Sequence, residues 1–179
     1  MWTTVKAAVV VVACVAGCAT APDTRAGRSD LEASARQTLR DMTLRQPSIQ
    51  QVLNTSAGYV VFPRIGEGGV IVGGAYGQGV LFEGGRRTGF VKVEQASVGA
   101  VLGGKSYSEI LVFRDREALR DVKDGEYELR ADADVVVLTA GAAATTTFKG
   151  KVVAFVLPVG GLMVDVSVAG QRLQYVPAG

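Results

Sequence analysis

Residues 99–106 read GAVLGGKS, which matches the nucleotide-binding pattern G-x-x-x-x-G-K-S at every position. In that pattern backbone amides surround the phosphates, the lysine contacts the terminal phosphate and the serine binds Mg²⁺. This chemistry requires a helix directly after the Lys-Ser pair, so that the helix N-terminus faces the anion. Here Lys105 and Ser106 are followed by the β-type run YSEILVF. We interpret the match as a coincidence in a glycine-rich sequence and expect neither a nucleotide site nor a nucleotide-hydrolysing enzyme.

Cys18 is the second chemically distinctive residue. It follows Lys6 and the apolar run 7–17, which ends in Val-Ala-Gly. A basic start, an apolar stretch of about 7–15 residues and small residues at the cleavage site are typical of a secretory signal peptide. The end of the run resembles the lipobox of bacterial lipoproteins, in which the cysteine is acylated and becomes the mature N-terminus. The alternative is an ordinary signal peptide cut at Ala16 or within 19–21, which would leave the protein soluble.

Acylation of Cys18 would hold the protein at a membrane, because two or more acyl chains anchor stably whereas one anchors marginally. The run 7–17 is itself shorter than the roughly 20 residues that span a bilayer. Ala19 stands where an aspartate would indicate retention in the inner membrane. We therefore expect a lipid-anchored protein of the bacterial cell envelope, in the outer membrane and facing the periplasm.

The composition excludes several classes of site. The chain has no histidine, and Cys14 and Cys18 are its two cysteines, so Ser-His-Asp and Cys-His nucleophilic sites and His-containing metal sites are excluded. We expect no catalytic residues, no metal and no cofactor. The 19 basic side chains face 17 acidic ones, and Lys6 would leave with the signal peptide. A charge so close to neutral gives no general attraction to nucleic acid.

The remaining chain has the size of one domain. We predict a signal peptide over 1–17, a lipidated tether over 18–28 and a single domain over 29–179. Ser29 and Glu32 fit a capping box, which predicts an amphipathic helix from Ser29 that ends at Pro47. A second short helix is expected to reach Asn54.

From Gly58 onward the hydrophobic period changes to two, which indicates antiparallel strands separated by glycine-rich turns. A charged helix capped by Asp115 interrupts them. Residues 140–147 could form either a strand of small residues or a loop. The fold class is therefore α+β, with N-terminal helices packed on a glycine-rich, curled antiparallel sheet of barrel or sandwich type. The expected strands are 59–63, 70–76, 80–83, 88–93, 97–102, 107–114, 127–130, 135–139, 152–157, 162–168 and 172–176.

Five motifs in order resemble the SYLF domain, a lipid-binding domain shared by bacterial lipoproteins and eukaryotic endocytic proteins. They are GYVVFP at 58–63, GGVIVGGAYGQG at 68–79, QASVG at 95–99, GGKSYSEI at 103–110 and GGLM at 160–163. The family commonly has glutamine where this chain has Lys105. The resemblance covers about 150 residues and implies binding of membrane lipids, including phosphoinositides in some members. Eukaryotic relatives also bind actin, through segments that have no match here.

The candidate lipid-binding residues are basic. Arg36 and Arg40 lie one turn apart on the first helix and could face anionic headgroups. The other four fall at expected turns and would form a basic rim if they converge; they are Arg64, Arg86, Arg87 and Lys105. The simpler interpretation of all six is ordinary solvated surface charge.

Two functions follow from these observations. The first is an envelope lipoprotein whose domain binds anionic or phosphoinositide-type lipid headgroups. The alternative is a structural envelope lipoprotein that acts only through protein partners. Neither function involves catalysis.

Overall fold

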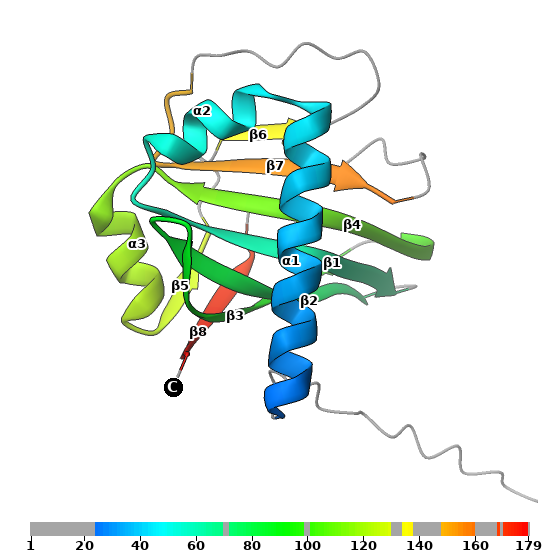
Figure 1. Cartoon of the computed structure of the whole chain (residues 1–179). Coiled ribbons are helices and arrows are strands. Elements are labelled where there is room, and N and C mark those ends of the chain that lie inside the picture. Colours follow the sequence, from blue (N-terminus) through cyan, green and yellow to red (C-terminus); the bar gives the residue numbers. More distant parts are fainter. Residues whose placement is uncertain are drawn as a thin grey trace, which may run out of the picture.

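The computed structural model describes residues 24–69, 72–98, 101–129, 134–137, 148–159, 168 and 170–178. The described residues form three helices and eight strands in one sheet (Figure 1). The helices are α1 (Arg25–Arg45), α2 (Ser48–Asn54) and α3 (Arg116–Lys123). The strands are β1 (Gly58–Gly69), β2 (Val72–Glu83), β3 (Arg86–Val98), β4 (Val101–Phe113), β5 (Glu126–Glu128), β6 (Asp134–Val137), β7 (Val152–Pro158) and β8 (Arg172–Pro177). The prediction of an α+β fold with a curled sheet is confirmed.

The strand order is β5-β8-β3-β2-β1-β4-β7-β6. All neighbours pair antiparallel except β6, which pairs parallel with β7 at one edge. The central four strands have the Greek-key order, since β4 returns to lie beside β1 and not beside β3.

Chain length requires the sheet to curl. Two strands separate β3 from β4, so in a flat sheet these would lie about 14 Å apart. The three peptide links from Val98 to Val101 span at most about 11 Å. The ends of β3 and β4 can therefore meet only if the sheet curls between them.

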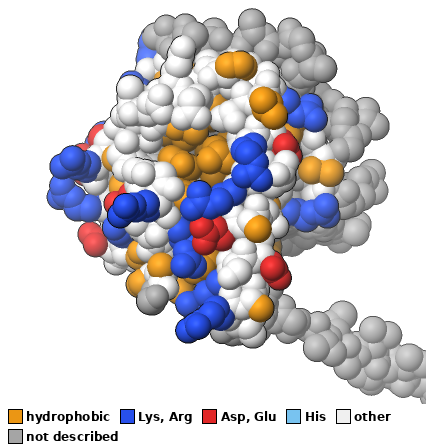
Figure 2. Space-filling model, in the orientation of Figure 1, with side chains coloured by type: hydrophobic (Ala, Val, Ile, Leu, Met, Phe, Trp, Pro, Cys, Tyr) orange, Lys and Arg blue, Asp and Glu red, His pale blue; other side chains and the backbone are white. Residues whose placement is uncertain are grey.

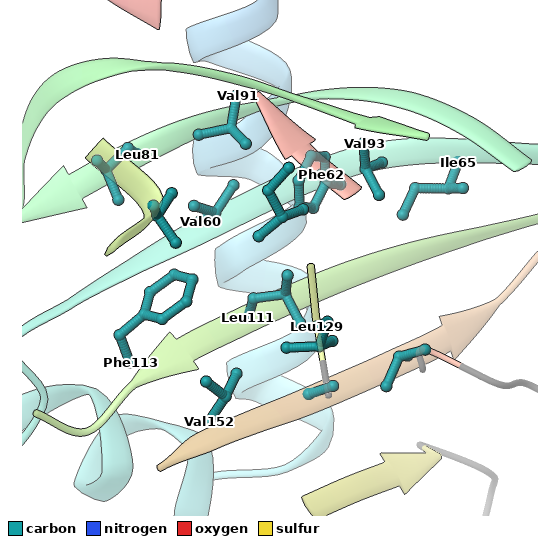
Figure 3. Packing of buried hydrophobic residues seen from close by; sticks show 14 of the residues in the cluster. Val60, Phe62, Ile65, Leu81, Val91, Val93, Leu111, Phe113, Leu129 and Val152 are labelled. Atoms are coloured by element: carbon teal, nitrogen blue, oxygen red, sulfur yellow. The ribbon is translucent and has the colours of Figure 1, made fainter. Parts of the chain in front are cut away.

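The two faces of the curled sheet carry separate cores. The inner core unites strands from both flanks: Ala154 of β7 and Leu173 of β8 belong to the same cluster, although four strands separate them in the order. Figure 3 shows the side chains of this cluster meeting on the side of the strands away from α1. The outer core is covered by α1 and α2, which contribute Ala35, Met42, Ile49 and Leu53. We call these two sides the inner and the outer face.

Strands β2 and β3 are longer than the sequence predicts, and in β2 the reason is that its glycines do not mark a turn. The expected strand 80–83 and residues 72–76 of the expected strand 70–76 belong to the single strand β2, and β3 joins 88–93 to residues 97–98. Gly77 and Gly79 lie inside β2 because they face larger neighbours on the inner face. A Cβ on Gly79 would come within 2.6 Å of the Phe62 ring, and one on Gly77 within 2.7 Å of the Ile65 side chain.

The predicted turn at Gly84 and Gly85 is confirmed. Both glycines have positive φ, +56° and +77°, as a tight two-residue hairpin turn requires. The helix break at Pro47 is also confirmed, since α1 ends at Arg45 and Pro47 caps α2.

The predicted start of the first helix is wrong. Thr24 is the N-cap and accepts a hydrogen bond from the Gly27 amide, so α1 begins at Arg25. Ser29 lies inside the helix, where its hydroxyl donates to the Arg25 carbonyl. Residues 25–28, predicted as part of the tether, are therefore helical. Cys18, the signal peptide and residues 140–147 lie outside the described residues, as does the expected strand 162–168 except for Val168.

Candidate functional site

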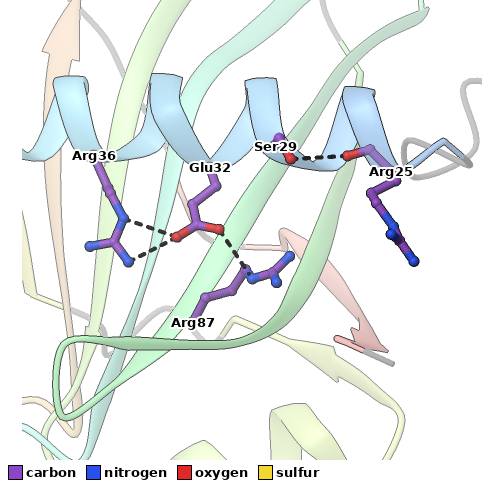
Figure 4. A network of polar contacts seen from close by, with 5 residues as sticks. All are labelled: Arg25, Ser29, Glu32, Arg36 and Arg87. Carbon is purple, nitrogen blue, oxygen red and sulfur yellow. Dashed lines mark hydrogen bonds and ion pairs between the residues drawn. The ribbon is translucent and has the colours of Figure 1, made fainter.

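Two arginines from different elements meet at one carboxylate on the outer face. Arg36 of α1 donates from Nε and Nη2 to Oε1 of Glu32, at 3.0 and 2.8 Å. The Nε of Arg87, at the start of β3, lies 3.2 Å from the other carboxylate oxygen, Oε2 (Figure 4). Glu32 therefore has each of its oxygens occupied by a different guanidinium. We call Arg36, Glu32 and Arg87 the arginine clamp.

The guanidinium groups of the clamp pack against aromatic rings. The Arg36 guanidinium carbon lies 5.0 Å from the centroid of the Phe82 ring, and that of Arg87 lies 5.2 Å from the Phe90 ring. Arg28 approaches the same Phe90 ring at 5.5 Å. Both phenylalanines are buried. Cation–π contacts of this kind orient a guanidinium over a ring without using its hydrogen-bond donors.

The helix sequence explains why these groups align. Arg28, Glu32 and Arg36 are spaced four residues apart, so they form one stripe along α1. Ala35 and Met42 are buried against the sheet, and this packing places the stripe next to the β2–β3 hairpin that carries Arg87. Figure 2 shows Lys and Arg side chains gathered along this side of the molecule around a central acidic group, beside an exposed hydrophobic area.

The clamp lies in a region of positive charge. Helix α1 contains five arginines and three carboxylates, and the hairpin adds Arg86 and Arg87. Arg40 lies one turn beyond Arg36, exposed, and donates to the side chain of Gln37 at 2.6 Å. Arg86 is exposed at the hairpin turn next to Arg87. Arg36, Arg40 and Arg87 thus belong to one side of the molecule. Arg86 directly precedes Arg87 in β3, and successive strand residues point to opposite faces, so it is not assigned to this side.

The remaining two predicted residues lie elsewhere. Arg64 is exposed and pairs with Gln78 in the β1–β2 register, whereas Arg87 pairs with Phe82. Four residues along β2 correspond to about 13 Å. Lys105 pairs with Glu67 and is two residues from the inner-face residue Tyr107 on an uninterrupted stretch of β4. Lys105 therefore faces the inner side, because alternate residues share a face.

Lys105 and Ser106 also show why the phosphate-loop pattern is misleading. Both residues lie within β4, and the strand continues through the predicted β-type run to Phe113. No helix follows Ser106 in this described stretch, so the arrangement that aims a helix N-terminus at a phosphate is not formed there.

A second polar cluster is buried on the inner face. Gln171 donates from Nε2 to Oε2 of Glu109 at 3.0 Å, and the same nitrogen lies 3.4 Å from the Tyr107 hydroxyl oxygen. Oε1 of Glu109 and Oε1 of Gln171 have no hydrogen-bond partner among the described residues. Burial raises the pKa of Glu109 to about 7, although the bond from Gln171 opposes the shift. Burial, reinforced by the charge of Glu109, also raises the pKa of Tyr107.

An open pocket of about 420 Å³ lies at the β3, β5 and β8 side of the sheet. Glu94, Glu128 and Arg172 contribute its charged side chains, and Arg172 Nε lies 3.7 Å from the Glu128 carboxylate. With two carboxylates and one guanidinium the pocket does not favour an anion. Among the described residues, no group of three or more acidic or cysteine side chains is arranged to hold a metal ion.

The sequence alone did not reveal three members of the outer-face site. From the sequence, Glu32 fits a helix cap and Phe82 fits the rim of an apolar pocket or the core, and nothing links these residues or Phe90 to the arginines. The four-residue spacing of Arg28, Glu32 and Arg36 was the available signal. Arg87 could be placed beside it only once the strand register was known.

Within the described residues, no helix has the length and apolar character needed to cross a bilayer. The chain matches no protein-family model and none of the curated proteins.

Proposed function

We propose that this chain is a lipid-anchored envelope lipoprotein whose SYLF-like domain binds anionic lipid headgroups through the arginine clamp and its surrounding arginines. The proposal includes acylation of Cys18 and a position in the outer membrane facing the periplasm. The observation that carries it is the concentration of arginines along α1 and the β2–β3 hairpin, each guanidinium of the clamp held over a buried ring.

The place of α1 in the chain supports the proposal. Helix α1 begins seven residues after Cys18, and seven extended residues reach at most about 24 Å. An acylated Cys18 would therefore keep the first turn of α1 close to the membrane. Each arginine near an anionic surface contributes about 1 kcal/mol of attraction, which falls off within a Debye length of about 8–10 Å. The anchor would keep the protein at the membrane, and the arginines would make it prefer anionic lipids.

Arg64 and Lys105 are not part of this proposed site, because the strand register places them away from the clamp. The buried Glu109 cluster and the carboxylate-lined pocket offer no cationic surface. The binding surface proposed here is thus the outer-face side that carries α1.

The test is vesicle flotation of the chain from residue 19 onward, which retains every described residue and both cores but cannot be acylated at Cys18. The vesicles contain phosphatidylcholine with a rising fraction of phosphatidylglycerol. We expect flotation that increases with the anionic fraction and decreases with salt. Cooperative thermal unfolding of the same sample shows that the domain is folded.

The alternative function makes the opposite prediction. If a folded domain fails to float at every anionic fraction, Cys18 supplies all of the membrane affinity, and the protein acts through protein partners at the envelope.

A further inference from the structure

The geometry of the arginine clamp suggests that Glu32 occupies a site for an external anion. Arg36 contacts one carboxylate oxygen and Arg87 the other, so two guanidiniums grip one planar anionic group from two elements. Guanidinium donors match the paired oxygens of a carboxylate and of a phosphate in the same way. Glu32 therefore makes the contacts that two oxygens of a phosphate group would make.

The arrangement of the two arginines does not depend on Glu32 alone. Phe82 lies beneath Arg36 and Phe90 beneath Arg87, and both rings are buried and belong to the outer core. The guanidiniums would stay over these rings if the carboxylate turned away. A preorganised pair of this kind loses little side-chain freedom when it binds a ligand.

Exchange of Glu32 for a ligand is feasible because the clamp is accessible. The exposed fractions of the side chains are 25% for Glu32, 32% for Arg87 and 43% for Arg36. Ion pairs with this degree of exposure contribute little to stability, since water and salt screen them. The clamp also retains a net positive charge, because two guanidiniums face one carboxylate and Arg28 stands at the same Phe90 ring.

We propose that Glu32 is an internal competitor at a phosphate-monoester site formed by Arg36 and Arg87, and that it lowers the affinity of this site for phosphate. A phosphate group displaces the carboxylate, which then turns toward solvent. The inference rests on the proposed function, because it concerns the same site. It names the chemical group that binds there and the carboxylate that competes with it. The phosphate can belong to a lipid headgroup or be free in solution.

The test compares Glu32→Gln with Asp30→Asn. Each substitution removes one negative charge from α1 and keeps the side-chain size. Residues two apart lie about 200° apart around a helix, and Asp30 is exposed. Asp30→Asn therefore removes a charge from nearly the same position along the helix axis, but from the side away from the clamp. Each variant and the parent chain are first tested for cooperative unfolding.

The first readout is flotation of residues 19–179 on phosphatidylcholine vesicles that contain phosphatidic acid, which ends in a phosphate monoester. We expect Glu32→Gln to bind about fivefold more tightly than the parent, the effect of one unit charge near an anionic surface. Asp30→Asn should change binding by less than about twofold, because salt screens a charge on the far side of the helix. Equal gains for the two variants would mean that net charge alone acts, and would overturn the proposal.

The second readout needs no membrane. The melting temperature of the whole acylated protein in detergent is compared between inorganic phosphate and chloride at equal ionic strength. A larger rise for Glu32→Gln than for Asp30→Asn shows that free phosphate suffices. A gain on vesicles alone shows that the phosphate must be presented by a lipid. If Glu32→Gln gains in neither readout, the proposal is wrong.

The double variant Glu32→Gln/Arg87→Gln tests whether the gain in binding requires the guanidinium of Arg87. The gain should disappear, since the second guanidinium is missing, and a gain that persists would contradict the site. Failure of the inference remains distinct from failure of the proposed function. The function fails if the parent chain floats on no anionic vesicle, whereas the inference fails if Glu32→Gln gains no more than Asp30→Asn both on phosphatidic acid vesicles and in free phosphate.

Discussion

Gln171 donates a hydrogen bond to Glu109 over 3.0 Å although 62 residues separate them in the chain. Gln171 immediately precedes β8, whereas Glu109 lies in β4, and three strands stand between β8 and β4 in the sheet. The bond therefore joins two flanks of the curled sheet across its inner face. The carboxyl of Glu109 is fully buried, so its protonation is coupled to the stability of the curl.

The first prediction concerns this coupling. The folded-state pKa of Glu109, about 7, lies above its ordinary value of 4.5. The folded protein therefore holds this proton more tightly than the unfolded chain, and the associated stability is full below about pH 4.5 and is lost as pH rises through 7. We expect a loss of about 3 kcal/mol across this window. The flanking residues in the register, Phe62 on β1 and Val156 on β7, carry no charge.

Urea unfolding across this pH range measures the effect, with Glu109→Gln as the control. The variant keeps a neutral side chain of the same size, so the difference in unfolding free energy between parent and variant should fall as pH rises and become constant above about pH 8. A difference that does not vary with pH would show that Glu109 does not titrate in this window. The other titrating groups cancel in the comparison, because they are present in both proteins.

The second prediction concerns the small residues of β2. Gly79→Ala would place a methyl group within 2.6 Å of the Phe62 ring and 2.8 Å of the Val61 carbonyl oxygen. Because both neighbours belong to the buried part of β1, the strain cannot be released at the surface, and we expect a loss of about 1–3 kcal/mol. Gly66→Ala is the matched control in β1, since nothing lies within 4 Å of its added Cβ. Chemical denaturation of both variants gives the comparison, and equal stabilities would contradict the packing argument.

The third prediction concerns the cap of α3. The side chain of Asp115 accepts a hydrogen bond from the Ala118 amide at 2.8 Å. Asp115→Ala removes this acceptor and should cost about 1 kcal/mol, whereas Asp115→Asn retains an N-cap acceptor and should cost much less. Thermal unfolding distinguishes the two. If Asn is as destabilising as Ala, the charge of Asp115 matters more than its capping bond.

The fourth prediction maps the basic residues. The double substitution Arg36→Gln/Arg87→Gln removes two positive charges from the outer-face side that carries α1. Arg64→Gln/Lys105→Gln removes the same number from positions that the register places away from the clamp. Since both pairs lower the net charge equally, flotation on phosphatidylglycerol vesicles should weaken strongly for the first pair and little for the second. The reverse order would assign binding to the positions around Arg64 and Lys105.

The sequence predicted the elements whose signals are local. The break at Pro47, the Asp115 cap and the Gly84-Gly85 turn each depend on residues within one or two turns of chain, and all three are present. The start of α1 was misplaced because Ser29 is at least as favourable an N-cap residue as Thr24 and has Glu32 at the capping-box position. Only the folded helix shows that Thr24 makes the capping bond.

What the sequence did not reveal depends on contacts between distant segments. Glycine favours turns in general, but Gly79 lies within a strand because Phe62 of the neighbouring strand fills the space above it. The basic residues pose the same problem. Arg36 and Arg87 are 51 positions apart and meet at Glu32. Arg64 and Lys105, which were predicted for the same site, do not join them. Their grouping follows from strand register, which residue spacing does not encode.

The sheet order has a consequence for how the chain folds. Strands β1, β2 and β3 can pair as they emerge, but the outer edge of β3 is covered only by β8, which pairs Gly89 with Pro177. Until β8 has been synthesised, β3 exposes a row of unpaired backbone amides and carbonyls, a template for joining another chain. Folding dominated by such distant pairings is slow, on the order of milliseconds to seconds. We therefore expect chains truncated before β8 to aggregate, even though α1, the arginine clamp and most of both cores would still be present.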